Sequence, residues 1–191
     1  MWRRISLCFV VLALAIAFGQ DWESAGDGRF TVLTASLEDA LYLPEIFAVL
    51  QRAQRDLRRQ ELELPDAVGI TIHPQLDSFL RATGLPWYVM ATAERGRAMV
   101  HSQRVRVLLE RGSLEKTLRH ELFHLAQPTD WPRWRAEGAA MIFAGERPSA
   151  APLEGLSERE LEAILASAPS AGVLARALAT AYLRVLQGPR D

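Results

Sequence analysis

The sequence has no asparagine and only one cysteine among its 191 residues. Because asparagine is absent, there is no N-x-[ST] acceptor, and N-glycosylation is excluded. The single cysteine, Cys8, lies in an N-terminal segment that we expect to be removed, so the mature protein would form no disulfide and no thiolate metal site. Any metal ion must then be held by histidine and carboxylate side chains.

An excess of positive charge is also missing. The chain carries 22 basic and 23 acidic residues, which gives a net charge of −1. Without Arg3 and Arg4 of the N-terminal segment the balance becomes 20 − 23 = −3. A mildly acidic chain offers no electrostatic case for binding nucleic acid. Its length suits one domain with a real core and is too short for two sizeable domains.

The first 19 residues differ in kind from the rest. Arg3 and Arg4 precede an uncharged apolar run at residues 5–18, which at about 14 residues is shorter than the roughly 20 that span a bilayer. This layout, ending in small residues, is typical of a signal peptide. We expect a signal peptide at residues 1–19, or an uncleaved N-terminal anchor as the alternative, and a protein that is secreted or lies in the cell envelope. Contact with a membrane is expected only if this segment stays attached.

The rest of the chain is predicted to be a polar lead-in at residues 20–28 and a single domain at residues 29–191. β-Branched and aromatic residues predict strands in the first half of this domain. One or two further strands are expected after a turn at "ERG". Together they make a small mixed sheet of four or five strands, at residues 29–36, at residues 67–74 and within residues 86–110.

Helical periodicity predicts a long helix at residues 36–60, broken or bent near Pro44. Shorter helices are predicted at residues 74–84, 113–128, 131–146, 157–168 and 170–187. Strands and the long helix come first and only helices follow, which is an α+β arrangement.

The stretch "TLRHELFHLAQ", residues 117–127, places two histidines four residues apart on one of these helices. Positions four apart share a helix face, so His120 and His124 can present ring nitrogens to one zinc ion at about 2.0–2.1 Å. Glu121 points beside such an ion, where a general base for an attacking water must lie. On its own, however, this HExxH motif also occurs as two surface histidines with a salt-bridging glutamate.

A catalytic zinc site needs a third protein ligand and an open fourth position for water. The first candidate is Glu137, which lies 13 residues beyond His124 on the next predicted helix. A short connection makes the two helices neighbours in space. The small residues Gly138, Ala139 and Ala140 leave little bulk to hold the two helices apart.

Two other carboxylates are also candidates for the third ligand. Asp130 falls where metzincins carry theirs, but that pattern needs a glycine at position 127, and Gln127 stands there. Glu146 follows Gly145 and is expected to lie past the end of its helix. Asp130 or a backbone carbonyl also remains a candidate for orienting the histidines.

"TLRHELFHL" followed by "WPRWRAEGAAMIFAG" resembles the gluzincin metallopeptidases, specifically the small bacterial peptidase-MA-like group with HExxH and a W-x-x-E-G-x-A helix. The order of the upstream elements is similar too, so the resemblance covers most of residues 29–146. It implies a zincin-like fold with His120, His124 and Glu137 as zinc ligands and Glu121 as catalytic base. It also implies a peptide or protein substrate that adds to the sheet edge, at the strand in "GRAMVHSQ" or its neighbour.

The implied reaction is hydrolysis of a peptide bond by a zinc-activated water, with Glu121 as general base. A second donor to the developing oxyanion is common in such sites. The sequence offers His101, Tyr88 and Tyr182 for this contact without choosing among them. The alternative function is a non-catalytic zinc-binding or protein-interaction module of the cell envelope.

Overall fold

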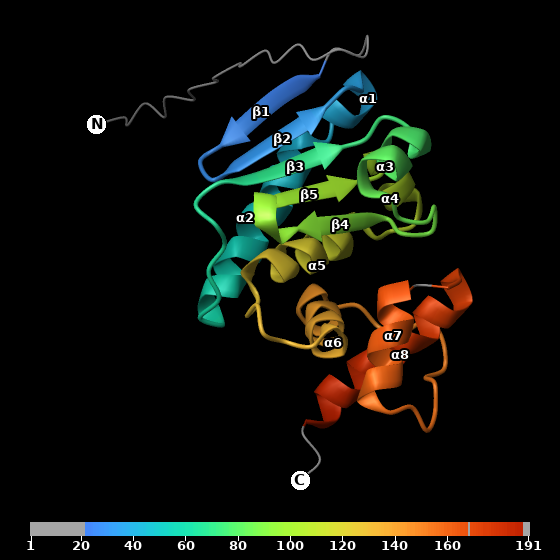
Figure 1. The fold of residues 1–191 in the computed structure, drawn as a ribbon. Helices are drawn as coiled ribbons and strands as arrows, with labels where there is room; N and C mark the ends of the chain where they lie inside the picture. The colour runs from blue at the N-terminus through green and yellow to red at the C-terminus, as the bar shows by residue number, and fades with distance from the viewer. Residues whose placement is uncertain (1–21, 168, 189–191) are drawn as a thin grey trace.

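The computed structural model describes residues 22–167 and 169–188 (Figure 1). The predicted signal peptide or anchor at residues 1–19, with Cys8, lies outside the described residues. Within them, a mixed five-stranded sheet is combined with eight helices, so the predicted α+β class is confirmed. No helix in this described part of the chain is both long and apolar enough to cross a bilayer.

The strands span Glu23–Asp27 (β1), Phe30–Thr34 (β2), Val68–Ile72 (β3), Ala91–Glu94 (β4) and Met99–Ser102 (β5). Their order in the sheet is β1-β2-β3-β5-β4. The central strands β2, β3 and β5 are parallel, whereas β1 and β4 are antiparallel to their neighbours. β4 is therefore the edge strand next to β5, and the strand in "GRAMVHSQ" is internal.

The helices span Leu37–Ala40 (α1), Leu43–Arg59 (α2), Leu76–Thr83 (α3), Val105–Glu110 (α4), Leu114–Ala126 (α5), Arg133–Ala144 (α6), Glu158–Ser167 (α7) and Ala171–Gln187 (α8). The predicted break near Pro44 is confirmed between α1 and α2. Pro44 lies in the first turn of α2, where its missing N–H costs no helical hydrogen bond.

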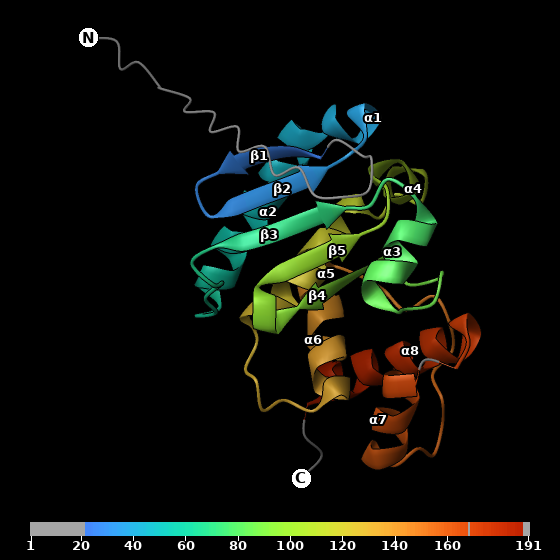
Figure 2. The ribbon, with the colours of Figure 1, turned by 45° about the horizontal axis from the view of Figure 1, so that its top comes forward.

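The main hydrophobic core lies between the sheet and the helices α2 and α5 (Figures 1 and 2). Because side chains alternate along a strand, Ile70, Ile72 and Val100 all point into this core. Leu50 of α2 and Leu122 of α5 meet them and are fully buried. Burying one such side chain contributes about 1.5–3 kcal/mol, so this packing fixes α5 against the sheet.

A second, smaller core joins α6 to the C-terminal helices α7 and α8, which lie together below the sheet in Figure 1. It is built from Leu161, Leu165, Ala177 and Ala181. Helix α6 contributes to both cores, since Ala140 and Phe143 belong to the main one. A helix packed on two sides needs apolar residues around most of its circumference, which explains the sequence "GAAMIFA".

Two predictions of secondary structure were wrong. Residues 23–27, expected in the polar lead-in, form β1, which pairs with β2 through a tight turn at Gly28 (φ 60°). The polar, largely exposed side chains of β1 hide this strand from a hydrophobic pattern, although an Asp-Gly pair is a known hairpin signal.

The second error concerns residues 105–110, which lie in the segment expected to hold only strands and a turn and which form α4. Val105 and Leu108 are its buried residues, and their spacing of three is helical. The backbone N–H of Val105 also donates to the buried carboxylate of Asp39 (3.2 Å), which stabilises the start of this helix.

Candidate metal centre

Helix α5 carries the HExxH motif on one flank of its buried stripe. Leu118 and Leu122 belong to the main core, and this fixes the rotation of the helix about its axis. His120 and His124 then lie together on the flank, with ring centroids 4.8 Å apart and side chains only 12% and 15% exposed.

Glu137 of α6 lies directly opposite the two histidines. Its Oε2 is 3.3 Å from Nε2 of His120 and 3.5 Å from Nε2 of His124. One potential ligand atom from each of the three residues lies within 4.8 Å of the other two. The structure therefore brings together the three residues that the sequence pattern selected as metal ligands. We call them the histidine–glutamate cluster.

The other ring nitrogen of each histidine faces a side chain outside the HExxH motif. Nδ1 of His124 lies 3.2 Å from Oε1 of Gln127, within hydrogen-bonding geometry. Nδ1 of His120 is buried and lies 3.3 Å from Oε1 of Glu146, but without hydrogen-bonding geometry. Both Nε2 atoms are thereby directed at Glu137.

Electrostatics in the histidine–glutamate cluster are dominated by burial and by opposite charges. Burial alone would lower the pKa of His120, but Glu137 and Glu146 outweigh it and hold that pKa well above its usual value. Burial would raise the pKa of Glu137, but His124 and His120 hold it well below its usual value. The cluster is thus already arranged around a positive charge.

Glu121 is only 8% exposed, one position round the helix from His120. Burial raises the pKa of its carboxyl group, although the positive charges of His120 and His124 oppose this. A carboxylate with a raised pKa accepts a proton more readily, which is the property a general base needs near neutral pH.

The donor atoms of the histidine–glutamate cluster fit a zinc ion. Two imidazole nitrogens and one carboxylate oxygen are the ligand set of many zinc sites. A tetrahedral ion with bonds of about 2.0–2.1 Å separates its ligand atoms by about 3.3 Å. The distances from Glu137 Oε2 to the two Nε2 atoms, 3.3 and 3.5 Å, are close to that separation.

The two other candidates for the third metal ligand, Asp130 and Glu146, do not converge with both Nε2 atoms. Asp130 is exposed in the loop between α5 and α6 and is not part of the histidine–glutamate cluster. Glu146 approaches the cluster, but from the outer nitrogen of His120, which is the side away from Glu137. Of the three candidate third ligands, only Glu137 converges with both Nε2 atoms.

The structure does not bring His101 to the histidine–glutamate cluster. His101 lies on the sheet face opposite α5, with its Nδ1 3.0 Å from Nε2 of His73 and its Nε2 3.7 Å from Glu94. Tyr88 lies in the segment before β4 and packs its ring against Trp87. Tyr182 lies half-buried on α8.

The close packing expected from Gly138 occurs at a different helix. A Cβ atom at Gly138 would lie 2.5 Å from the backbone oxygen of Ala181 and 2.7 Å from Cγ2 of Val185. Gly138 therefore lets α6 approach α8, not α5. The α5 side of α6 is built from Ala140 and Phe143.

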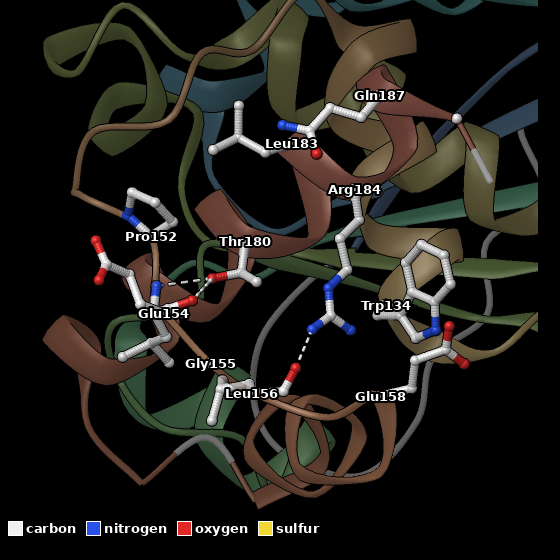
Figure 3. A pocket seen from close by; sticks show the side chains of 12 residues that line it. Trp134, Pro152, Glu154, Gly155, Leu156, Glu158, Thr180, Leu183, Arg184 and Gln187 are labelled. Atoms are coloured by element: carbon white, nitrogen blue, oxygen red, sulfur yellow. Dashed lines mark hydrogen bonds between the residues drawn. The ribbon is translucent and has the colours of Figure 1, made fainter. Parts of the chain in front are cut away.

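A cavity of about 550 Å³ lies between the start of α6, the loop at residues 152–156 and α8 (Figure 3). Arg184 extends into it and donates a hydrogen bond to the backbone oxygen of Leu156. The hydroxyl of Thr180 accepts from the backbone N–H of Leu153 at 2.8 Å. No member of the histidine–glutamate cluster lines this cavity, so it is separate from the candidate metal centre.

Sequence reasoning missed the contact made by Gln127. That residue was weighed only as an obstacle to the metzincin pattern, yet its side chain faces His124 and is 8% exposed. The available signal was its position three residues after His124, which brings it onto the same side of the helix end.

Comparison of the chain with protein-family models, with curated proteins and with solved structures found no match. The residues themselves and their geometry are therefore the basis for any functional conclusion.

Proposed function

We propose that the protein is an exported zinc-dependent peptidase of the gluzincin type, which hydrolyses bonds in peptide or protein substrates. The observation that carries this proposal is the convergence of His120, His124 and Glu137, with Oε2 of Glu137 3.3 and 3.5 Å from the two Nε2 atoms. The buried carboxylate of Glu121 beside them supports a catalytic role over a purely structural one. Export rests on the sequence of residues 1–19 alone.

Each residue of the site has a distinct task in this proposal. His120, His124 and Glu137 hold the zinc ion, which supplies a positive charge that acidifies water and stabilises an oxyanion. Glu121 takes the proton of the attacking water and then passes it to the leaving amine. Burial raises the pKa of Glu121, and this favours the proton transfer from water.

The alternative is a non-catalytic zinc-binding or protein-interaction module. It is favoured by the small exposure of the cluster side chains, 12% for His120 and 21% for Glu137, which leaves a substrate little surface to meet. Glu121 argues against it, because a structural zinc has no use for a base and closes its fourth position.

Replacing Glu121 by Gln separates the two functions. The peptidase proposal expects zinc binding to be kept and turnover to fall by about 10²–10⁴, the usual contribution of a general base. Turnover is measured as hydrolysis of fluorescently labelled casein by the zinc-loaded protein. The matched control is Glu115→Gln on the same helix, where Glu115 only forms an exposed ion pair with Arg52.

Equal hydrolysis by the parent and the Glu121→Gln variant would contradict the peptidase proposal. Zinc binding by the parent without any hydrolysis of casein would support the non-catalytic alternative. Loss of zinc from the Glu121→Gln variant would contradict the assignment of Glu121 as a base outside the ligand set.

A further inference from the structure

Both histidines of the HExxH motif have an outer nitrogen, Nδ1, that faces a side chain located just past a helix end. His124 Nδ1 faces Gln127, the residue that follows the last turn of α5. His120 Nδ1 faces Glu146, the second residue after α6. Neither residue belongs to the pattern that identifies the zinc ligands.

The backbone around Glu146 is held at several points. Gly145 adopts a left-handed conformation (φ 69°), and the N–H of Glu146 donates to the backbone oxygen of Met141 at 2.9 Å. Arg119, next to His120 on α5, donates to the backbone oxygen of Phe143 at 3.0 Å. The end of α6 is thereby fixed to α5 beside His120, with Glu146 directed back at the ring.

The backbone of Gln127 is held in a comparable way. Its N–H donates to the backbone oxygen of Phe123 at 2.8 Å, and its carbonyl accepts from Arg95 Nη2 at 2.5 Å. The Gln127 side chain is buried, so its amide has little access to competing water. A side chain with a fixed backbone and little solvent can hold an imidazole ring in one orientation.

The chemistry of the two contacts is that of outer partners of a metal-bound imidazole. A ring that donates its Nδ1–H to an oxygen acceptor keeps Nε2 as a lone-pair donor and cannot rotate away from the ion. The buried Nδ1 of His120 has no hydrogen-bond partner, and Oε1 of Glu146, 3.3 Å away, is the acceptor that faces it.

We propose that Glu146 and Gln127 are positioning residues of the metal centre, which orient His120 and His124 through their Nδ1 atoms. The inference rests on the proposed function only in its claim that the histidine–glutamate cluster binds zinc. Glu146 has the larger role, because a carboxylate makes a stronger, charge-assisted hydrogen bond and raises the basicity of the ring. Gln127 supplies a neutral acceptor and fixes orientation alone.

The test compares the zinc affinity of four variants with that of the parent, measured by competition with a chelating dye. Glu146→Gln is expected to weaken binding about 10- to 100-fold, and Gln127→Ala by less, the usual range for outer partners. Glu146→Asp is expected to recover part of the loss. The matched control is Glu154→Gln, at an exposed position in the loop before α7, and it is expected to bind like the parent.

Two further measurements distinguish positioning from a general effect on folding. Thermal unfolding in the presence of a chelator is expected to give similar midpoints for the parent and Glu146→Gln. The visible absorption spectrum of the cobalt-loaded protein reports ligand geometry and is expected to change in Glu146→Gln but not in Glu154→Gln.

Parent-like zinc affinity and cobalt spectrum in Glu146→Gln would overturn this inference and leave the proposed function intact. A loss of metal-free stability in Glu146→Gln that equals, in free energy, its loss of zinc binding would also overturn the inference, because Glu146 would then be structural. Absence of zinc binding by the parent itself would refute the proposed function, and the two failures are therefore distinguishable.

Discussion

All four histidines of the chain fall into two pairs, which lie on opposite faces of the sheet and differ in their surroundings. His120 and His124 lie beside α6, where Glu137 and Glu146 face them at 3.3–3.5 Å. His73 and His101 form the sheet histidine pair, whose facing nitrogens are 3.0 Å apart. The nearest carboxylate to that second pair, Glu94, is 3.7 Å from His101.

The difference shows in the pKa values. Burial lowers the pKa of His73 to about 4, and the neighbouring His101 adds to the effect. His120 is also buried, yet two carboxylates hold its pKa well above the usual value. Two close imidazoles therefore do not make a cation site by themselves. Carboxylates that converge on them decide whether a positive charge is stabilised there.

Among substitutions at the two histidine pairs, the largest expected effect is the loss of stabilisation by zinc. At a free zinc concentration of 1,000 times Kd, binding adds about 4 kcal/mol to the free energy of unfolding. His120→Ala is expected to abolish this gain, whereas His101→Ala keeps it. Thermal unfolding with zinc and with a chelator measures both. If the zinc-dependent shift survived His120→Ala but not His101→Ala, the metal would be bound by the sheet histidine pair, which contradicts the account.

The next effect is the pH dependence that His73 gives to stability. The unfolded chain protonates this residue near pH 6.5 and the folded chain only at about 4, so the unfolded state binds more protons between these values. Stability therefore falls as the pH drops from 6.5 to 4, by about 1.4 kcal/mol per unit and about 3 kcal/mol in total.

His73→Leu is expected to reduce this slope while leaving zinc affinity at pH 7.5 unchanged. Urea unfolding from pH 7 to 4, in the presence of a chelator, gives the free energies of unfolding for both proteins. Identical slopes in the parent and the variant would contradict the depressed pKa of His73.

Gly138→Ala is expected to have a smaller effect on the free energy of unfolding, and this effect arises from the packing of α6. The new Cβ would lie 2.5 Å from the backbone oxygen of Ala181, and relief of this clash costs about 1–3 kcal/mol of stability. Because Glu137 is next in sequence, a shift of α6 also weakens zinc binding, whereas the pH slope due to His73 persists.

The matched control for this substitution is Gly172→Ala on α8, where a Cβ would meet no atom within 4 Å beyond the adjacent backbone of its own helix. Its free energy of unfolding is expected to match the parent or to rise slightly, since alanine is the better helix former. Chemical denaturation measures both variants. A stable Gly138→Ala protein with parent-like zinc affinity would show that α6 tolerates displacement.

The smallest expected effect is that of Asp130→Ala. This carboxylate is exposed in the loop after α5, so zinc affinity measured by chelator competition should equal that of the parent. A marked loss of affinity would indicate that the loop folds back onto the histidines when metal binds.

The sequence predicted the parts of the fold that depend on local pattern. The strands rich in β-branched and aromatic residues, the break near Pro44 and the helix ending at Gly145 follow from residue preference and periodicity, and the structure confirms them. β1 was missed because its side chains are polar, and its order comes from pairing with β2, which is a tertiary contact. α4 was missed because residues 86–110 were interpreted as strands joined by a turn, whereas the buried residues Val105 and Leu108 have helical spacing.

The candidate site likewise has one part that the sequence predicted and another that it did not. HExxH on a helix and a glutamate on the following helix were enough to select His120, His124 and Glu137, because helix geometry fixes which residues share a face. The contacts of Glu146 and Gln127 depend on how two helix ends are held by Arg119 and Arg95. Such anchoring involves residues more than 20 positions apart, and no local pattern encodes it.

The most direct test of the account is the zinc content per chain after equilibrium dialysis against zinc, for the parent, Glu137→Ala and His101→Ala. The account predicts one zinc ion in the parent and in His101→Ala, and none retained at the same free zinc concentration in Glu137→Ala. A parent that retains no zinc, or a Glu137→Ala variant that retains it fully, would contradict the assignment of the histidine–glutamate cluster as a metal centre.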